Sequence, residues 1–248
     1  MSEDLVSIRM IYVAGTQPDH DLWRLGAGRA SVPIVFDAFD AGAATGPLAL
    51  GGVDICIIDS TVTEEFRAKL VKVARAAKPS PFMVVSAPRG SPRVDAVDGM
   101  VPRPSSLEEA RRAVELCVRV KIPTRVLIVD DSSTMRGIVR KILAASRFAL
   151  DIHEASEGIA AVNQLRTGNF GMVFLDYNMP GLNGFETLSK IKRESPNVAV
   201  VMMTSTLNNA IADRAHAAGA HAFLKKPFYP ADIDTVLVRY FGMHPSRR

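Results

Sequence analysis

Phe174-Leu175-Asp176-Tyr177-Asn178-Met179-Pro180 is the stretch around which the predicted fold is organised. The apolar run that leads into it, residues 171–175, has the pattern of a buried strand, and Asp176 places a carboxylate where that strand ends. Two other predicted strands also end in charged side chains, one in the pair Asp130-Asp131 and one in Lys226. In an open α/β sheet, functional groups converge at the C-terminal ends of the strands. The sequence therefore predicts a site where these three strand ends meet.

The second half of the chain alternates predicted strands and helices five times. The strands are expected at 125–129, 150–153, 171–175, 198–203 and 220–224, and the helices at 134–146, 158–166, 185–193, 208–218 and 231–240. Five βα units imply a mostly parallel sheet that helices cover on both faces, and right-handed crossovers leave few topologies for it. The fold class expected is α/β, doubly wound, flavodoxin-like (βα)5, with strand order 2-1-3-4-5.

The first half repeats this order of elements with weaker signals. Strands are expected at 8–14, 33–39, 52–59, 81–86 and 99–101, and a Ser106 to Glu109 capping box opens the last helix. Pro123 ends that helix and the next strand starts by Val126, so the linker between the two halves is only about four residues. We interpret the chain as an internal duplication, with one domain at 1–121 and a second at 122–248, each with a parallel five-stranded sheet.

Composition excludes several classes of protein. The 248 residues are 48% hydrophobic and 23% charged, as expected for a globular protein with a full core. No apolar run reaches about 18 residues and no basic region precedes an apolar one at the N-terminus, so neither a membrane span nor a signal peptide is predicted. The net charge of +4 forms no basic stripe with aromatic residues, so nucleic acid is not an expected partner. Cys56 and Cys117 fit buried reduced thiols of a cytoplasmic protein better than a disulfide.

The predicted strand ends specify a chemistry. Two carboxylates about 5 Å apart repel by roughly 3 kcal/mol at an effective dielectric near 20, and a hard cation such as Mg²⁺ relieves that repulsion. Thr204 would add a hydroxyl and Lys226 an ammonium at the same edge, so the set suits a tetrahedral dianion, with Asp176 as nucleophile and an acyl phosphate as product. The alternative is that each aspartate only caps the turn or helix that follows it.

The second half resembles the receiver domains of two-component response regulators. The motifs that carry the resemblance have the family's spacing and span almost the whole of that half: Val126-Leu127-Ile128-Val129-Asp130-Asp131-Ser132-Ser133-Thr134-Met135-Arg136, Leu175-Asp176-Tyr177-Asn178-Met179-Pro180-Gly181, Met203-Thr204-Ser205 and Lys226-Pro227-Phe228. The start of the first helix is most similar to the CheY-like chemotaxis regulators.

The resemblance implies a role for each residue of the site. Asp176 would accept a phosphoryl group from a histidine kinase or a phosphotransfer protein, and Lys226, before a cis proline, would pair with that group. Thr204 would turn toward the phosphoryl group, and Phe223 occupies the position of the switch aromatic that follows it. Mg²⁺ would be bound by four groups, directly or through water: Asp130, Asp131, Asp176 and the backbone carbonyl of Asn178. Asn178 and Thr206 stand where the family tunes hydrolysis of the acyl phosphate, and the implied self-dephosphorylation is intermediate in rate.

The first half has the features of a degenerate copy. Asp59, Ser86 and Arg103-Pro104 correspond to Asp176, Thr204 and Lys226-Pro227, but its first strand ends without an acidic pair. Arginine also differs from lysine in shape and hydrogen bonding. We therefore expect a receiver-like domain that accepts no phosphate; Asp19 or Asp21, placed in the next loop, stays open as a substitute ligand.

The expected function is that of a response regulator that signals through protein contacts and is not an enzyme. No fused output domain is expected, and the output face would span about 208–240. The partners would be a phosphodonor, a downstream protein and, as a further candidate, a second copy of the chain. A constitutive interaction scaffold with a vestigial site is the alternative. A metal-dependent phosphatase is less favoured, because it would need a general acid at the position of Asn178.

Overall fold

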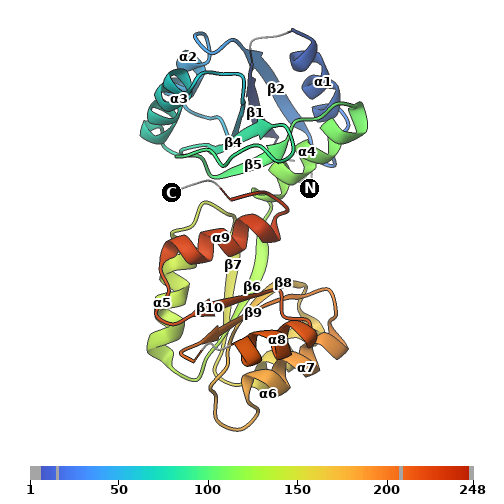
Figure 1. The fold of residues 1–248 in the computed structure, drawn as a ribbon, viewed down its shortest axis with the longest axis vertical. Coiled ribbons are helices and arrows are strands. Elements are labelled where there is room, and N and C mark those ends of the chain that lie inside the picture. The colour runs from blue at the N-terminus through green and yellow to red at the C-terminus, as the bar shows by residue number, and fades with distance from the viewer. Residues whose placement is uncertain (1–6, 15–16, 207–208, 246–248) are drawn as a thin grey trace, which may run out of the picture. The chain divides into compact units, whose positions relative to one another are not determined.

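The computed structural model describes residues 7–14, 17–206 and 209–245. By its internal contacts the chain divides into two compact units, and Figure 1 shows the sheet and helices of each. Unit 1 takes the residues up to Lys121 together with the segment that starts at Phe241, and unit 2 takes Ile122–Tyr240. Each unit contains a parallel five-stranded sheet in the order 2-1-3-4-5, which confirms the predicted fold class of two flavodoxin-like domains.

Unit 2 follows the predicted alternation closely. Its elements are β6 (Thr124–Val129), α5 (Ser133–Ala144), β7 (Leu150–Ala155), α6 (Gly158–Thr167), β8 (Phe170–Asp176), α7 (Gly184–Glu194), β9 (Ala199–Thr204), α8 (Asn209–Ala217), β10 (Ala222–Lys225) and α9 (Pro230–Tyr240). Local signals set the helix starts: Ser132 caps α5, and Asn183 with Glu186 forms a capping box on α7. Because β6 lies between β7 and β8 in the sheet, the ends of β6 and β8 are neighbours.

Unit 1 contains two helices that the sequence pattern did not indicate, α1 and α2. Its elements are β1 (Ile8–Val13), α1 (Gln17–Ala27), β2 (Ile34–Phe39), α2 (Thr45–Leu50), β3 (Ile55–Asp59), α3 (Glu64–Ala76), β4 (Phe82–Ala87), β5 (Gly99–Pro102) and α4 (Leu107–Arg119). The prediction that Asp19 and Asp21 lie in a loop is wrong, since both lie in α1. Residues 88–98, all of which the structure describes, connect β4 to β5 without a helix.

Helices cover both faces of each sheet. In unit 1, α1 packs with α4 on one face, while α2 and α3 cover a core on the other that includes Leu48, Leu70 and Val85. In unit 2, α5 packs with α9 on one face, and α6, α7 and α8 contribute Leu165, Leu188 and Ala215 to the core on the other. Over the described residues, no helix has the length and apolar character that a membrane span requires.

The segment from Phe241 belongs to unit 1, although the preceding 119 residues, 122–240, form unit 2. His244 and Met100 exchange two backbone hydrogen bonds of 2.9 and 3.0 Å, so the segment pairs antiparallel with the edge strand β5. Phe241 and Met243 are buried, and Arg119 of α4 lies over the Phe241 ring. Unit 1 is therefore built from two stretches of sequence.

Candidate functional site

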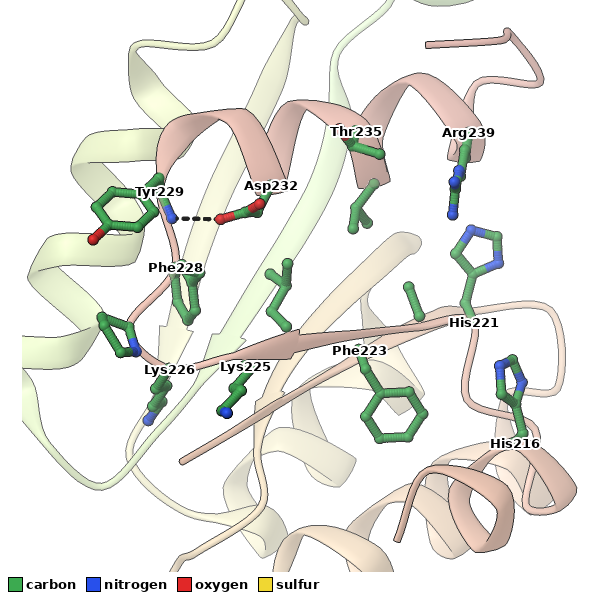
Figure 2. A pocket seen from close by; sticks show the side chains of 14 residues that line it. His216, His221, Phe223, Lys225, Lys226, Phe228, Tyr229, Asp232, Thr235 and Arg239 are labelled. Atoms are coloured by element: carbon green, nitrogen blue, oxygen red, sulfur yellow. Dashed lines mark hydrogen bonds between the residues drawn. The ribbon is translucent and has the colours of Figure 1, made fainter. Parts of the chain in front are cut away.

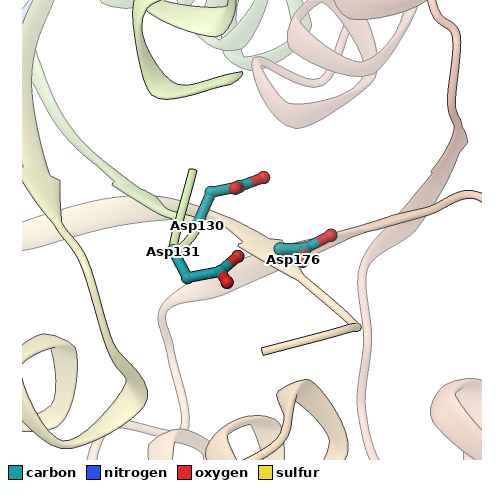
Figure 3. A group of neighbouring side chains, drawn as sticks. All are labelled: Asp130, Asp131 and Asp176. Carbon is teal, nitrogen blue, oxygen red and sulfur yellow. The ribbon is translucent and has the colours of Figure 1, made fainter. Parts of the chain in front are cut away.

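Three carboxylates meet at the neighbouring ends of β6 and β8, as Figure 3 shows. One oxygen from each of Asp130, Asp131 and Asp176 can be chosen so that all lie within 4.8 Å of one another. Asp130 and Asp176 are buried, while Asp131 is exposed. The Ser132 N–H donates to Asp130 Oδ1 at 2.9 Å, which fixes this carboxylate at the start of α5. The predicted convergence of the strand ends is thus what the fold produces.

Lys226 lies between two of these carboxylates. Its Nζ donates to Asp130 Oδ2 and to Asp176 Oδ1, both at 2.8 Å, and its side chain is mostly buried. Its backbone N–H donates to the Thr204 carbonyl at 2.7 Å, and the peptide bond to Pro227 is cis, as the resemblance implied. Register brings the lysine there, because β10 pairs with β9 and β9 pairs with β8.

Burial and hydrogen bonding together set the pKa values of Asp176 and Lys226. Burial disfavours the carboxylate and raises the pKa of Asp176, although the hydrogen bond from Lys226 acts in the opposite direction. Burial alone lowers the pKa of Lys226, but its hydrogen bonds to Asp130 and Asp176 outweigh that effect, so the pKa is raised. The lysine is therefore a stable cation at the centre of an acidic site.

The remaining predicted residues surround this centre. The buried Thr204 hydroxyl donates to the Thr206 carbonyl and accepts from the Thr206 N–H, both at 3.1 Å, so it is bonded within its own loop rather than to Asp176. Asn178 Nδ2 donates to Ser205 Oγ at 3.4 Å across the same edge. Phe223, labelled in Figure 2, is half-buried on β10. Its ring centroid lies 6.0 Å from that of His216.

A close approach shapes the loop after Asp176. The Gly184 N–H donates to the Tyr177 carbonyl at 3.1 Å, which holds the first turn of α7 against the end of β8. A Cβ at position 184 would overlap the Asp176 carbonyl oxygen and Tyr177 Cα. Glycine is therefore required at this position by space, whatever its backbone conformation.

Two residues that support the site, Arg136 and Glu154, were given no role from the sequence alone. Arg136 of α5 donates to the backbone carbonyl of Asp130 at 2.9 Å, weakly to that of Asp131 at 3.4 Å, and to Glu154 Oε2 at 3.0 Å. Arg140, one turn later, pairs with the other Glu154 oxygen. The i,i+4 spacing of the two arginines was the available signal, but only the register of β7 with β6 shows that Glu154 faces them. The Arg136 side chain therefore holds the backbone of Asp130 and Asp131 in place.

The corresponding site of unit 1 is internally paired. Asp59 is fully buried, and its carboxylate accepts hydrogen bonds from Arg103, from the Tyr12 hydroxyl at 3.1 Å and from the N–H and hydroxyl of Thr61 at 2.8 and 2.7 Å. Burial and the charge of Asp59 raise the pKa of Tyr12, so this phenol remains a donor. Neither Ser86 Oγ nor Arg103 Nε has a partner in the described part of the chain.

Comparisons with known proteins match unit 2. The family model described as "Response regulator receiver domain" matches residues 126–238. Chemotaxis protein CheY-3 of Vibrio cholerae is 35% identical over 119 residues, which cover 47% of this chain and 91% of that protein. Response regulator UvrY of Escherichia coli is 34% identical over 108 residues, and the match covers 44% of this chain and half of UvrY.

Solved structures extend the match to both units at the level of the fold. The structure titled "probable two-component system response regulator/GGDEF domain protein" aligns with a TM-score of 0.55 and 19% identity. It covers 95% of this chain and 98% of its own. At that identity the likeness concerns the fold alone, and it includes a receiver-like N-terminal unit.

Proposed function

The chain belongs to the response regulator receiver family through its second unit, and from that premise we propose that Asp176 is the acceptor of a phosphoryl group. The donor is a phosphohistidine on a histidine kinase or on a phosphotransfer protein. The observation that carries the proposal is the position of Lys226 Nζ, 2.8 Å from a carboxylate oxygen of both Asp130 and Asp176.

The residues present fit a bound Mg²⁺. The cluster has three carboxylates whose oxygens lie within 4.8 Å of one another, and Lys226 pairs with two of them, so an excess of negative charge is left. Asp131 is exposed to solvent. Mg²⁺ prefers such oxygen ligands and keeps several waters. We assign Asp130, Asp131, Asp176 and the backbone carbonyl of Asn178 as its ligands. When bound, the ion would neutralise phosphoryl oxygens during transfer.

In the proposed step, an oxygen of the Asp176 carboxylate attacks phosphorus. The P–O bond to Asp176 forms as the P–N bond to histidine breaks, and the imidazole leaves with the electron pair of that bond. Lys226 keeps its proton and offers an ammonium to the new dianion. The Thr204 hydroxyl would leave the Thr206 carbonyl for a phosphoryl oxygen, and Phe223 would move into the space that this motion vacates.

We further propose that hydrolysis returns the protein to its initial state. Asn178 follows the end of β8 by two residues and Thr206 follows the end of β9 by two residues, so both lie beside the proposed acceptor site. Both side chains are small and polar, and neither supplies a strong acid or base. The lifetime of the acyl phosphate is therefore expected to be intermediate. Apart from phosphoryl transfer to Asp176 and this self-dephosphorylation, the protein would act as a signalling module.

We propose that output passes through the surface formed by α8, β10 and α9. This surface contains a pocket of about 840 Å³, shown in Figure 2, whose lining includes Phe223, Lys225, Tyr229 and Arg239. Phe223 lines the pocket from β10 and also packs against the core, so its movement would change the pocket's shape. The partner is a downstream protein, with a second copy of the chain as a further candidate. A cytoplasmic location stays a prediction.

Unit 1 would serve docking, dimerisation or partner choice rather than phosphorylation. Asp59 has no exposed surface, and Arg103 already neutralises it. A phosphoryl group at Asp59 would have to displace the Tyr12 and Thr61 hydrogen bonds as well. We therefore propose a receiver-like unit whose acceptor position is permanently paired.

Phosphorylation by acetyl phosphate with Mg²⁺, followed by intact mass spectrometry, tests these assignments. The wild-type chain should gain one phosphoryl group, Asp176→Asn none, and Asp59→Asn one. Label that survives Asp176→Asn but disappears in Asp59→Asn would reverse the assignment of the two units.

Mg²⁺ binding separates a working site from a vestigial one. A ligand that binds only the folded state raises the melting temperature, so Mg²⁺ should stabilise the wild-type chain in calorimetry. Asp130→Asn should lose that stabilisation. A melt that Mg²⁺ leaves unchanged would favour the constitutive scaffold instead.

A further inference from the structure

The connection between β4 and β5 leaves part of unit 1 open. In unit 2, α8 lies between the corresponding strands β9 and β10, whereas residues 88–98 of unit 1 form a loop without a helix. The loop starts at the C-terminal end of β4, the edge of an α/β sheet at which ligands commonly bind. The same unit has lost its acidic pair and has its acceptor position closed by Arg103. Its open edge therefore lies beside the degenerate site.

A pocket of about 460 Å³ occupies this position. Its lining comes from the end of β4, from the loop, from β5 and from the segment after Phe241, all within unit 1. Met100, Val101 and Ala87 supply buried apolar surface. Pockets of this size bind small molecules, whose apolar part lies on such surface.

The charge of the lining has one sign. Arg89, Arg93 and His244 line the pocket, and no acidic residue does so in the part of the chain that the structure describes. Both arginine side chains are exposed and neither forms an ion pair with a described residue. Glu109 interacts electrostatically with Arg89, but its carboxylate accepts hydrogen bonds from Ser105. The two guanidinium groups are therefore available to an anion.

We propose that unit 1 binds a small organic anion in this pocket, with a phosphate or carboxylate on the two arginines and an apolar body on β5. Guanidinium groups match both anions through paired hydrogen bonds. His244 closes one side of the pocket from the segment that pairs with β5. The site is distinct from the proposed phosphoacceptor centre, which lies in unit 2.

Binding of phenyl phosphate and of benzoate to the full-length chain tests the proposal. Amide chemical shifts are followed by NMR without Mg²⁺, and saturable shifts are expected at the non-proline positions among residues 88–93, 99–102 and 244. Saturation by one of the two probes and not the other assigns the anionic group. Inorganic phosphate should bind at least tenfold more weakly than phenyl phosphate, because it has no apolar body. Equal affinities would refute the role of β5.

The double variant Arg89→Gln/Arg93→Gln should raise Kd at least tenfold. The matched control Arg111→Gln/Arg112→Gln removes the same charge from α4 of the same unit and should change Kd less than twofold, because both arginines pair with Glu108. The proposal is overturned if neither probe gives saturable shifts at 10 mM, if both variants weaken binding equally, or if the shifts cluster outside the pocket.

Discussion

Removing the arginine that pairs with Asp59 should destabilise unit 1 strongly. In Arg103→Met, the fully buried carboxylate would keep its hydrogen bonds from Tyr12 and Thr61 but lose the one cation that pairs with it among the residues that the structure describes. Breaking a buried ion pair by removing one partner costs about 3–5 kcal/mol. Arg103 is 28% exposed and other donors remain, so the lower end, about 3 kcal/mol, is expected.

Trp23 makes this effect measurable in unit 1. It is the single tryptophan of the chain, it is buried, and it stacks on Tyr12 at 5.1 Å between ring centroids. Urea unfolding followed by its fluorescence should shift to a midpoint lower by about 1 M, for a slope of roughly 2–3 kcal/mol per M. Circular dichroism recorded on the same samples gives the unfolding of the whole chain.

Two variants test whether Asp59 is held as a charged group. Asp59→Asn/Arg103→Met removes the uncompensated charge, so it should recover at least half of the lost stability. Arg111→Met breaks an exposed pair on α4 and should leave the midpoint unchanged. A single variant that loses less than about 1 kcal/mol, or a double variant no more stable than the single one, would show that Asp59 is not held as a charged group.

Three further outcomes follow from the contacts described. Gly184→Ala places a methyl group against the Asp176 carbonyl, so Mg²⁺ affinity measured by calorimetry should fall at least tenfold; unchanged affinity would mean that α7 can retreat freely. Phe241→Ala should lower the urea midpoint seen by Trp23 fluorescence, at a cost of about 3–5 kcal/mol for a buried phenylalanine, and an unmoved midpoint would contradict its place in unit 1. Arg136→Gln removes charge-assisted bonds to the Asp130 carbonyl and Glu154, so circular dichroism should show a loss of about 2 kcal/mol; a loss below about 0.5 kcal/mol would mean that solvent replaces these bonds.

The sequence predicted unit 2 well because its local signals agree with its fold. Apolar runs mark β6, β8 and β9, and caps such as Ser132 mark the helix starts. The convergence of the site residues could be predicted because they lie at the ends of strands whose order the topology restricts. These residues are Asp130, Asp131, Asp176 and Lys226. The bonding of the Thr204 hydroxyl within its own loop could not be predicted, because side-chain torsions leave no trace in periodicity.

Unit 1 was harder to predict for physical reasons. The short helix α2 is only six residues long, has no side-chain hydrogen bond at its N-cap and contains a proline, so no local signal marks it. Arg103 could be placed beside Asp59 because it corresponds to Lys226, but no pattern indicated the bond from Tyr12, which lies on β1, 47 residues away in the sequence. The antiparallel pairing of His244 with Met100 spans still more sequence and has no local pattern at all.

The two-part construction of unit 1 has a consequence for the nascent chain. Translation delivers β1 to α4 first, but Phe241 and Met243, which complete their packing, emerge only after the whole of unit 2. At about 5–20 residues per second, the 124 residues from 122 to 245 take roughly 6–25 s to synthesise. During that interval, the edge of β5 that later pairs with His244 has exposed backbone donors and acceptors near the ribosome. The unit that is synthesised first is thus the one whose folding finishes last.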